Sequence, residues 1–298
     1  MSARPSMAFV FAGGSSLGCI QVGMLKALIK RGIVPDFVVG SSAGAINAVH
    51  FANDPTVSGV AQLESIWCSL ERSDIFPVSR LGGLLRLLRQ RSYLVESTGL
   101  SRLLESRLAL RDLAATRIPC HVVTTDLLQG TEFRVHTGPA IPALLASAAI
   151  PGIFPAVRLH GRYLIDGGVA NHTPISAALD LGAEIIYVLP TGYSCELKAP
   201  PRNAIGVALH GLNILIARQL VTDVRQLGAR GDIRVVPPLC PLGVSPYDFA
   251  AGQGLIERAE SSTLDWLDHG TEMVDGVPHA LPPHSHEDEE RPYGPHVH

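Results

Sequence analysis

The chain has 298 residues, of which 46% are hydrophobic and 17% are charged, and its formal net charge at pH 7 is -3. This length and composition are typical of a folded protein with one large domain or two ordinary ones, and they argue against a disordered chain. Because the sequence has no broad excess of basic residues, a nucleic-acid-binding role has little support.

The chain begins with a predicted strand–helix–strand unit. The apolar run 7–11 predicts a buried strand of a parallel sheet, apolar residues at helical spacing predict a helix over 18–31, and residues 35–40 predict a second strand. A right-handed crossover brings the ends of both strands to the same carboxyl edge of the sheet. The glycine-rich stretches 12–18 and 39–44 follow these strands, so we expect them to lie side by side.

Strands and helices alternate along the rest of the chain. Helices are expected over 43–51, 57–70, 100–113, 139–149, 174–182, 203–227 and 247–269. Strands are expected over 118–125, 132–135, 184–190 and 232–236, and a hairpin over 157–165. No internal repeat is present, so we predict a single α/β domain over residues 1–269.

An arginine- and leucine-rich segment interrupts this pattern at residues 79–91. Basic amphipathic segments lie in membrane interfaces or cap lipid-binding clefts. An ordinary surface helix with snorkelling arginines such as Arg86, Arg89 and Arg91 accounts for the same pattern. Both interpretations remain open, and with them a transient contact with a membrane surface.

The composition changes after residue 270, where Pro, His, Glu and Asp dominate. A solvated, disordered tail over 270–298 is the favoured interpretation of this stretch. The alternative is a metal site formed by its histidines, which are His279, His284, His286, His296 and His298.

Cysteine spacing and hydropathy indicate the cellular compartment in which the protein works. The five cysteines are scattered and form no C-x-x-C pair, which predicts reduced thiols and neither a disulfide framework nor a zinc site. No secretory signal and no uninterrupted apolar stretch of about 18 residues is visible. We therefore expect a cytoplasmic protein without a membrane span.

The second glycine-rich stretch has the form G-x-S-x-G over residues 40–44. In this motif a serine sits on a tight strand-to-helix turn with its hydroxyl exposed. Ser42 is therefore the candidate nucleophile, flanked by Gly40 and Gly44. On its own the motif is weak, because small residues also fill turns for backbone reasons.

A serine nucleophile requires a base, and Asp166 is the favoured candidate. It ends a strand-like run and precedes Gly167 and Gly168, which allow its backbone to approach the serine turn closely. A carboxylate within hydrogen-bond reach accepts the serine proton directly, and burial raises its basicity.

A Ser-His-Asp triad is the alternative arrangement. His172 and His210 are its candidate histidines, but neither has a local context that marks it as a base. We expect no special role for His50 and His121, which lie on a predicted helix face and a predicted strand.

The first glycine-rich stretch supplies candidate donors for an oxyanion. Gly13, Gly14 and Ser15 follow a predicted strand and open a helix near Gly18, so their backbone N–H groups can point into the same space as Ser42. The stretch lacks the dinucleotide-binding register and a P-loop lysine, which argues against a nucleotide cofactor.

Taken together, these motifs resemble those of the patatin-like phospholipases over residues 7–189. The matching blocks are the glycine-rich loop with its helix, 39–48, 146–155, 166–168 and 171–174. The resemblance implies a three-layer α/β/α fold around a central, mostly parallel sheet. It further implies hydrolysis of acyl esters in lipids through an acyl-enzyme, without a metal, a cofactor or a catalytic histidine.

By the same resemblance, the family's nucleophile falls on Ser42, its dyad carboxylate on Asp166 and its oxyanion hole on residues 13–15. The chain departs from the family pattern at two positions, with Ser15 at the third glycine and Leu17 at the basic residue of the loop. Two alternatives therefore remain open. One is a non-catalytic lipid-binding or regulatory protein, and the other is an esterase or thioesterase that uses a triad.

Overall fold

The computed structural model describes residues 4–75, 92–192, 195, 200, 204–246, 248–274 and 277–282. The basic amphipathic segment expected at 79–91 lies outside the described residues, as does the stretch 283–298 of the expected tail.

A mixed, mostly parallel sheet forms the middle of the molecule. Its hydrogen-bonded order is β5-β6-β3-β2-β1-β7-β8, and β4 pairs with β3. The strands are β1 (Met7–Phe11), β2 (Phe37–Ser41), β3 (Cys120–Asp126), β4 (Glu132–Val135), β5 (Val157–Leu159), β6 (Arg162–Asp166), β7 (Ile185–Leu189) and β8 (Asp232–Val235). Strands β3, β2, β1, β7 and β8 run parallel, whereas β4 and β6 are antiparallel to β3.

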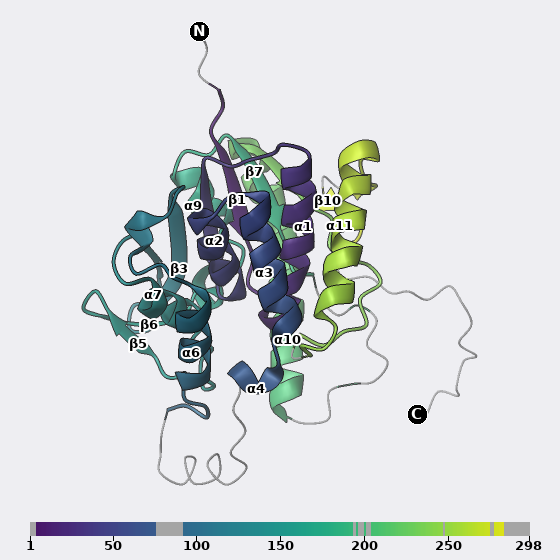
Figure 1. Ribbon diagram of the computed structural model, residues 1–298. Coiled ribbons are helices and arrows are strands. Elements are labelled where there is room, and N and C mark those ends of the chain that lie inside the picture. The colour runs from purple at the N-terminus through teal and green to yellow at the C-terminus, as the bar shows by residue number, and fades with distance from the viewer. Residues whose placement is uncertain are drawn as a thin grey trace, which may run out of the picture.

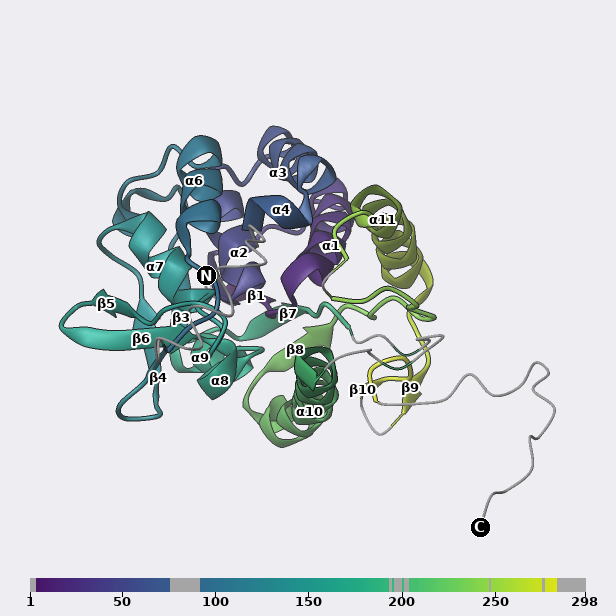
Figure 2. The same cartoon turned by 90° about the horizontal axis from the view of Figure 1, so that it is seen from below.

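Helices cover both faces of this sheet, as Figure 2 shows. One face carries α1 (Gly18–Lys30), α2 (Ala43–Asn53), α3 (Val57–Ser69), α4 (Arg72–Ile75), α6 (Thr98–Arg107), α7 (Ala140–Ser147) and α11 (Gly252–His269). The other carries α8 (Gly168–Asn171), α9 (Ile175–Asp180) and α10 (Ala204–Leu227). Two separate hydrophobic clusters lie between these layers, so the expected three-layer α/β/α architecture is confirmed.

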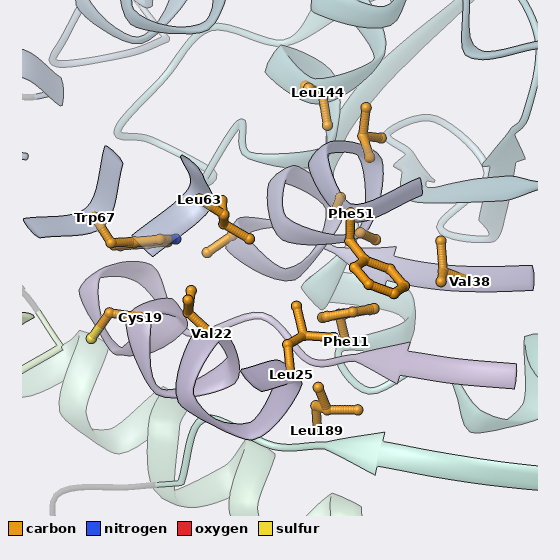
Figure 3. Packing of buried hydrophobic residues seen from close by; sticks show 14 of the residues in the cluster. Phe11, Cys19, Val22, Leu25, Val38, Phe51, Leu63, Trp67, Leu144 and Leu189 are labelled. Atoms are coloured by element: carbon orange, nitrogen blue, oxygen red, sulfur yellow. The ribbon is translucent and has the colours of Figure 1, made fainter. Parts of the chain in front are cut away.

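The larger cluster lies under the first helices of the chain. Figure 3 shows the side chains of Phe11, Leu25 and Phe51 where α1 and α2 pack on β1, and the rings of Phe11 and Phe51 lie 6.5 Å apart. Strand β1 is buried because β2 and β7 flank it and helices cover both of its faces, which explains its uninterrupted apolar run.

A buried polar network ties these helices to the ends of the strands. The Trp67 indole donates to Asn47 Oδ1 (2.8 Å), and the Asn47 amide donates to Gln21 Oε1 (2.7 Å). The Gln21 amide in turn donates to the carbonyls of Ala12 (2.8 Å) and Leu189 (2.9 Å). The network therefore holds the residue immediately before the glycine-rich loop against the neighbouring strand β7.

Two expectations from the sequence need correction. The helix expected over 100–113 ends at Arg107, because Leu108 and Leu110 alternate into the core in extended chain and Asp112 caps a separate 3₁₀ turn at Leu113–Ala115. The stretch expected to be a disordered tail begins with an ordered strand pair, β9 (Met273–Val274) and β10 (Val277–Pro278). Val277 and Leu281 are buried, which anchors these residues to the smaller hydrophobic cluster.

Within the described residues, the helices are too short or too polar to span a lipid bilayer.

Candidate active site

Ser42 lies on a tight turn between β2 and α2, as the motif predicts. Its φ of 53° is in the left-handed region, where a residue with a side chain is strained. A Cβ at Gly44 would lie 2.3 Å from the Ala12 carbonyl oxygen, and one at Gly40 would lie 2.5 Å from the Gly44 oxygen. Only glycines at these positions let the start of α2 pack so closely on the ends of β1 and β2.

The Ser42 hydroxyl donates a hydrogen bond to Asp166 Oδ2, at 2.7 Å. The other carboxylate oxygen, Oδ1, accepts a hydrogen bond from the Gly168 N–H at 2.7 Å. Asp166 is buried, and this burial raises its pKa to about 6, although the hydrogen bonds from Ser42 and Gly168 oppose the shift. The carboxylate is therefore more basic than an exposed aspartate and yet is mostly ionised at pH 7.

Sheet register explains how residues 124 positions apart in the chain meet. Ser41 at the end of β2 pairs with Val123, and Asp166 at the end of β6 pairs with the next residue of β3, Thr124. Because β2 is parallel and β6 antiparallel to β3, the two strands reach this point from opposite directions. Ser42 is the first residue after β2, and Asp166 is the last residue of β6. The two residues consequently face each other.

Ser147 at the end of α7 links these strand ends, a contribution that the sequence analysis missed. Its hydroxyl donates to the Val123 carbonyl (2.6 Å) and accepts from the Ser42 N–H (2.9 Å). The Gly167 N–H donates to the Ser147 carbonyl. Ser147 lies in the matching block 146–155, which was the only signal in the sequence that pointed to it.

The glycine-rich loop lies beside Ser42, but its three N–H groups differ. The Gly13 N–H donates to the His172 carbonyl at 3.1 Å, so it is not a free donor, contrary to the expectation from the sequence. The N–H groups of Gly14 and Ser15 have no partner within the described residues. Ser15 lines the same pocket as Ser42. Two of the three expected donors are thus available to a ligand.

The candidate histidines do not complete a triad in this structure. His172 is half-buried against the loop, where a Cβ at Gly13 would lie 2.6 Å from its Cε1 atom. Burial lowers its pKa to about 4, so the imidazole is neutral at pH 7. Within the described residues, no hydrogen bond joins an imidazole to Ser42 or Asp166. His210 lies on α10, and His50 lines the pocket from α2.

Ser42 and Ser15 line an apolar pocket. Its volume is about 850 Å³ with the open mouth included. Its walls come from α2, α3, α6 and the segment after α7, and its apolar lining includes Ile46, Leu63, Trp67, Leu104 and Phe154. This lining suits a hydrocarbon chain, because burial of apolar surface drives such binding.

Leu17, which stands at the family's basic loop position, does not face this pocket. Its side chain is 2% exposed and belongs to the larger hydrophobic cluster. The leucine therefore contributes to the core and is not part of the pocket wall. Within the described residues, no group of three or more His, Cys, Asp or Glu side chains is arranged to hold a metal ion.

Comparison with known proteins gives three findings. A family model described as patatin-like phospholipase matches residues 9–179. Patatin-like phospholipase domain-containing protein 7 of Rattus norvegicus is 29% identical over 227 residues, which are 74% of this chain and 16% of that protein. Lysophospholipase NTE1 of Mycosarcoma maydis is 28% identical over 218 residues, which are 72% of this chain and 11% of that protein.

Among solved structures, human GIVD cytosolic phospholipase A2 matches with a TM-score of 0.48 and 11% sequence identity, covering 89% of this chain and 59% of that chain. The chain spans 16% of the length of the rat protein and 11% of the length of the fungal protein.

Proposed function

The chain belongs to the patatin-like phospholipase family, whose model matches more than half of it, and from this premise we propose that it is a serine hydrolase of carboxylic esters in lipids. The observation that carries the proposal is the hydrogen bond of 2.7 Å between Ser42 Oγ and Asp166 Oδ2, because Ser42 also lines an apolar pocket.

In the proposed acylation step, Ser42 Oγ attacks the ester carbonyl carbon while Asp166 Oδ2 accepts the hydroxyl proton. The pKa of about 6 supports this role, because the carboxylate is ionised at neutral pH and holds a proton better than an ordinary aspartate. Asp166 then returns the proton to the leaving alcohol, and the acyl group remains on Ser42.

The negative charge that develops on the carbonyl oxygen needs donors. The N–H groups of Gly14 and Ser15, which have no partner in the part of the chain that the structure describes, are the proposed oxyanion hole, and the engaged N–H of Gly13 is left out of it. In deacylation, Asp166 accepts a proton from water while the water oxygen attacks the acyl carbonyl carbon, and the same two N–H groups stabilise the resulting oxyanion. The bond from that carbon to Ser42 Oγ then breaks, Asp166 returns the proton to Ser42 Oγ, and the fatty acid is released. This cycle needs no metal and no cofactor.

The substrate class follows from the pocket. An apolar lining that begins at the nucleophile suits the fatty-acyl part of a lipid ester, with the alcohol part left toward solvent. One relative's name, lysophospholipase, supports single-chain phospholipids as substrates to test first. The non-catalytic lipid-binding alternative keeps the pocket but predicts no turnover.

The proposal is tested with an alkyl fluorophosphonate probe and with hydrolysis of p-nitrophenyl esters and lysophosphatidylcholine. We expect the unchanged chain to be labelled, to release fatty acid and to prefer octanoyl over acetyl esters, and Ser42→Ala to lose labelling and turnover. Ser41→Ala is the matched control, because the Ser41 hydroxyl is buried without a hydrogen-bond partner in the described part of the chain. It should retain both activities.

Equal labelling of the Ser42→Ala variant and the unchanged chain would remove Ser42 as the nucleophile. Liposome binding without labelling or hydrolysis by the unchanged chain would favour the non-catalytic alternative. Loss of labelling in Asp166→Asn supports the dyad, whereas an Asp166→Asn variant that is labelled at the normal rate would contradict it.

A further inference from the structure

Thr191, which follows β7, contacts the glycine-rich loop from a different strand. Its hydroxyl donates a hydrogen bond to the Gly13 carbonyl oxygen, at 2.7 Å. Thr191 is 4% exposed, so water does not compete for this carbonyl from the Thr191 side. The contact is close enough that a Cβ at Gly14 would lie 2.2 Å from Thr191 Oγ1.

The Gly13 carbonyl belongs to the same peptide unit as the Gly14 N–H. A trans peptide is planar, and its C=O and N–H point in opposite directions. A hydroxyl that holds the carbonyl on one side of the loop therefore also sets the direction of the N–H on the other side. Hydrogen bonding to the carbonyl additionally polarises the peptide, which makes its N–H a stronger donor.

The support behind Thr191 is rigid. β7 pairs with β1 along its whole length, and the Ala12 N–H donates to the Leu189 carbonyl at 3.2 Å. The buried Gln21 amide bridges the carbonyls of Ala12 and Leu189. The position of Thr191 relative to Gly13 is thus set by the centre of the sheet and does not depend on the loop itself.

We propose that Thr191 is a positioning residue for ester hydrolysis, whose hydroxyl holds the Gly13–Gly14 peptide so that the Gly14 N–H faces the oxyanion at Ser42. The inference rests on the proposed function, since it assigns a role within that oxyanion hole. Thr191 itself does not touch the substrate and does not move a proton.

The test compares Thr191→Ser with Thr191→Ala, because these two side chains differ only in the hydroxyl. We measure kcat and KM for p-nitrophenyl octanoate, the second-order rate of fluorophosphonate labelling, and the pH profile. Thr191→Ala should lose about 3- to 10-fold in kcat and in labelling rate, because this factor corresponds to the net free energy of one hydrogen bond. KM and the pH profile should stay unchanged, and Thr191→Ser should keep most of the activity.

Thr191→Val, which fills nearly the same volume, is the second variant and guards against a loss that comes from a cavity. Melting temperature and circular dichroism establish that each variant is folded. Normal kcat in Thr191→Val, whether or not Thr191→Ala loses activity, or an equal loss in Thr191→Ser and Thr191→Ala, would overturn the inference. Ser42→Ala distinguishes failure of this inference from failure of the proposed function. If Ser42→Ala keeps full turnover, the proposed function itself fails, whatever the result for the Thr191 variants.

Discussion

Asp166 lies in an environment that pulls its pKa in two directions. Burial disfavours the charged carboxylate and dominates, while the hydrogen bonds donated by Ser42 and Gly168 favour it. The resulting pKa of about 6 lies near working pH, where a general base combines adequate basicity with a high ionised fraction. The burial that raises the basicity of Asp166, as the proposed role requires, also makes the ionised carboxylate unfavourable for folding.

The first prediction at this scale concerns the pH dependence of activity. kcat/KM should rise with pH and level off above a midpoint near 6, because the protonated carboxyl cannot accept the Ser42 proton. Initial rates on a soluble ester between pH 4.5 and 8 measure this midpoint. His172, with a pKa lowered to about 4, is mostly neutral over this range and adds no step near pH 6. A midpoint near 4 would contradict the assignment.

The second prediction concerns stability. Because the pKa of Asp166 is raised from 3.8 unfolded to about 6 folded, the folded state holds the proton more tightly, and ionisation destabilises it. Asp166→Asn should therefore increase the free energy of unfolding at pH 7, by up to about 3 kcal/mol. The difference from the unchanged chain should shrink as pH falls from 6 to 4.

Urea unfolding of both proteins at pH 4 and pH 7 provides the measurement. A variant that is less stable than the unchanged chain at pH 7, or a difference that does not depend on pH, would contradict the prediction.

At the scale of elements, the site depends on close packing where helices start. The beginning of α2 lies directly on the end of β1, and the glycine at position 44 leaves room for the carbonyls of Phe11 and Ala12. These are backbone atoms, which cannot move aside as a flexible side chain can. The turn that carries Ser42 and the glycine-rich loop are therefore joined by direct backbone contact.

Replacing this glycine tests that contact. Gly44→Ala should destabilise the protein by about 1–3 kcal/mol, because its Cβ would lie 2.3 Å from the Ala12 oxygen. Gly211→Ala is the matched control, since Gly211 also lies in a helix, α10, and a Cβ there meets nothing within 4 Å. The control should be stabilised by about 0.5–1 kcal/mol. Equal effects of the two substitutions on unfolding would refute the close-contact argument.

At the scale of the whole molecule, the fold extends beyond the part that the family model matches. That match ends at residue 179, before β7, β8, α10 and α11. Yet β7 pairs with β1 in the middle of the sheet, and α11 packs alongside α1 (Figure 1). Lys26 on α1 forms ion pairs with Glu64 on α3 and Glu260 on α11. We propose that residues 1–269 and the strand pair that follows fold as one domain.

Truncation tests this proposal. A chain that ends after residue 250 lacks α11 and exposes the core around α1 and α3, so it should fail to fold cooperatively. A chain that ends after residue 282 keeps the buried Val277 and Leu281 and should melt at the same temperature as the full chain. Calorimetry of both shortened chains measures these transitions. A normal unfolding transition for the chain that ends after residue 250 would contradict the proposal, because the C-terminal part would then be dispensable for folding.

The amino-acid sequence alone predicts most elements of this fold, because hydrophobic periodicity and glycine or proline boundaries are local properties. Strand β1, helices α1 and α2 and the hairpin of β5 and β6 lie where the patterns indicate. The early end of α6 and the ordered residues 277–282 escape such reasoning, because burial of Leu108, Val277 and Leu281 depends on partners that are distant in the chain.

The same division applies to the site. Its motifs identify Ser42, Asp166 and the glycine-rich loop from the sequence alone, because each requires particular residue types on a particular turn. Tertiary structure alone decides that Ser42 and Asp166 share a hydrogen bond, that the Gly13 N–H is already occupied, and that Leu17 belongs to the core. These facts follow from strand register and from contacts across the sheet, which no local pattern encodes.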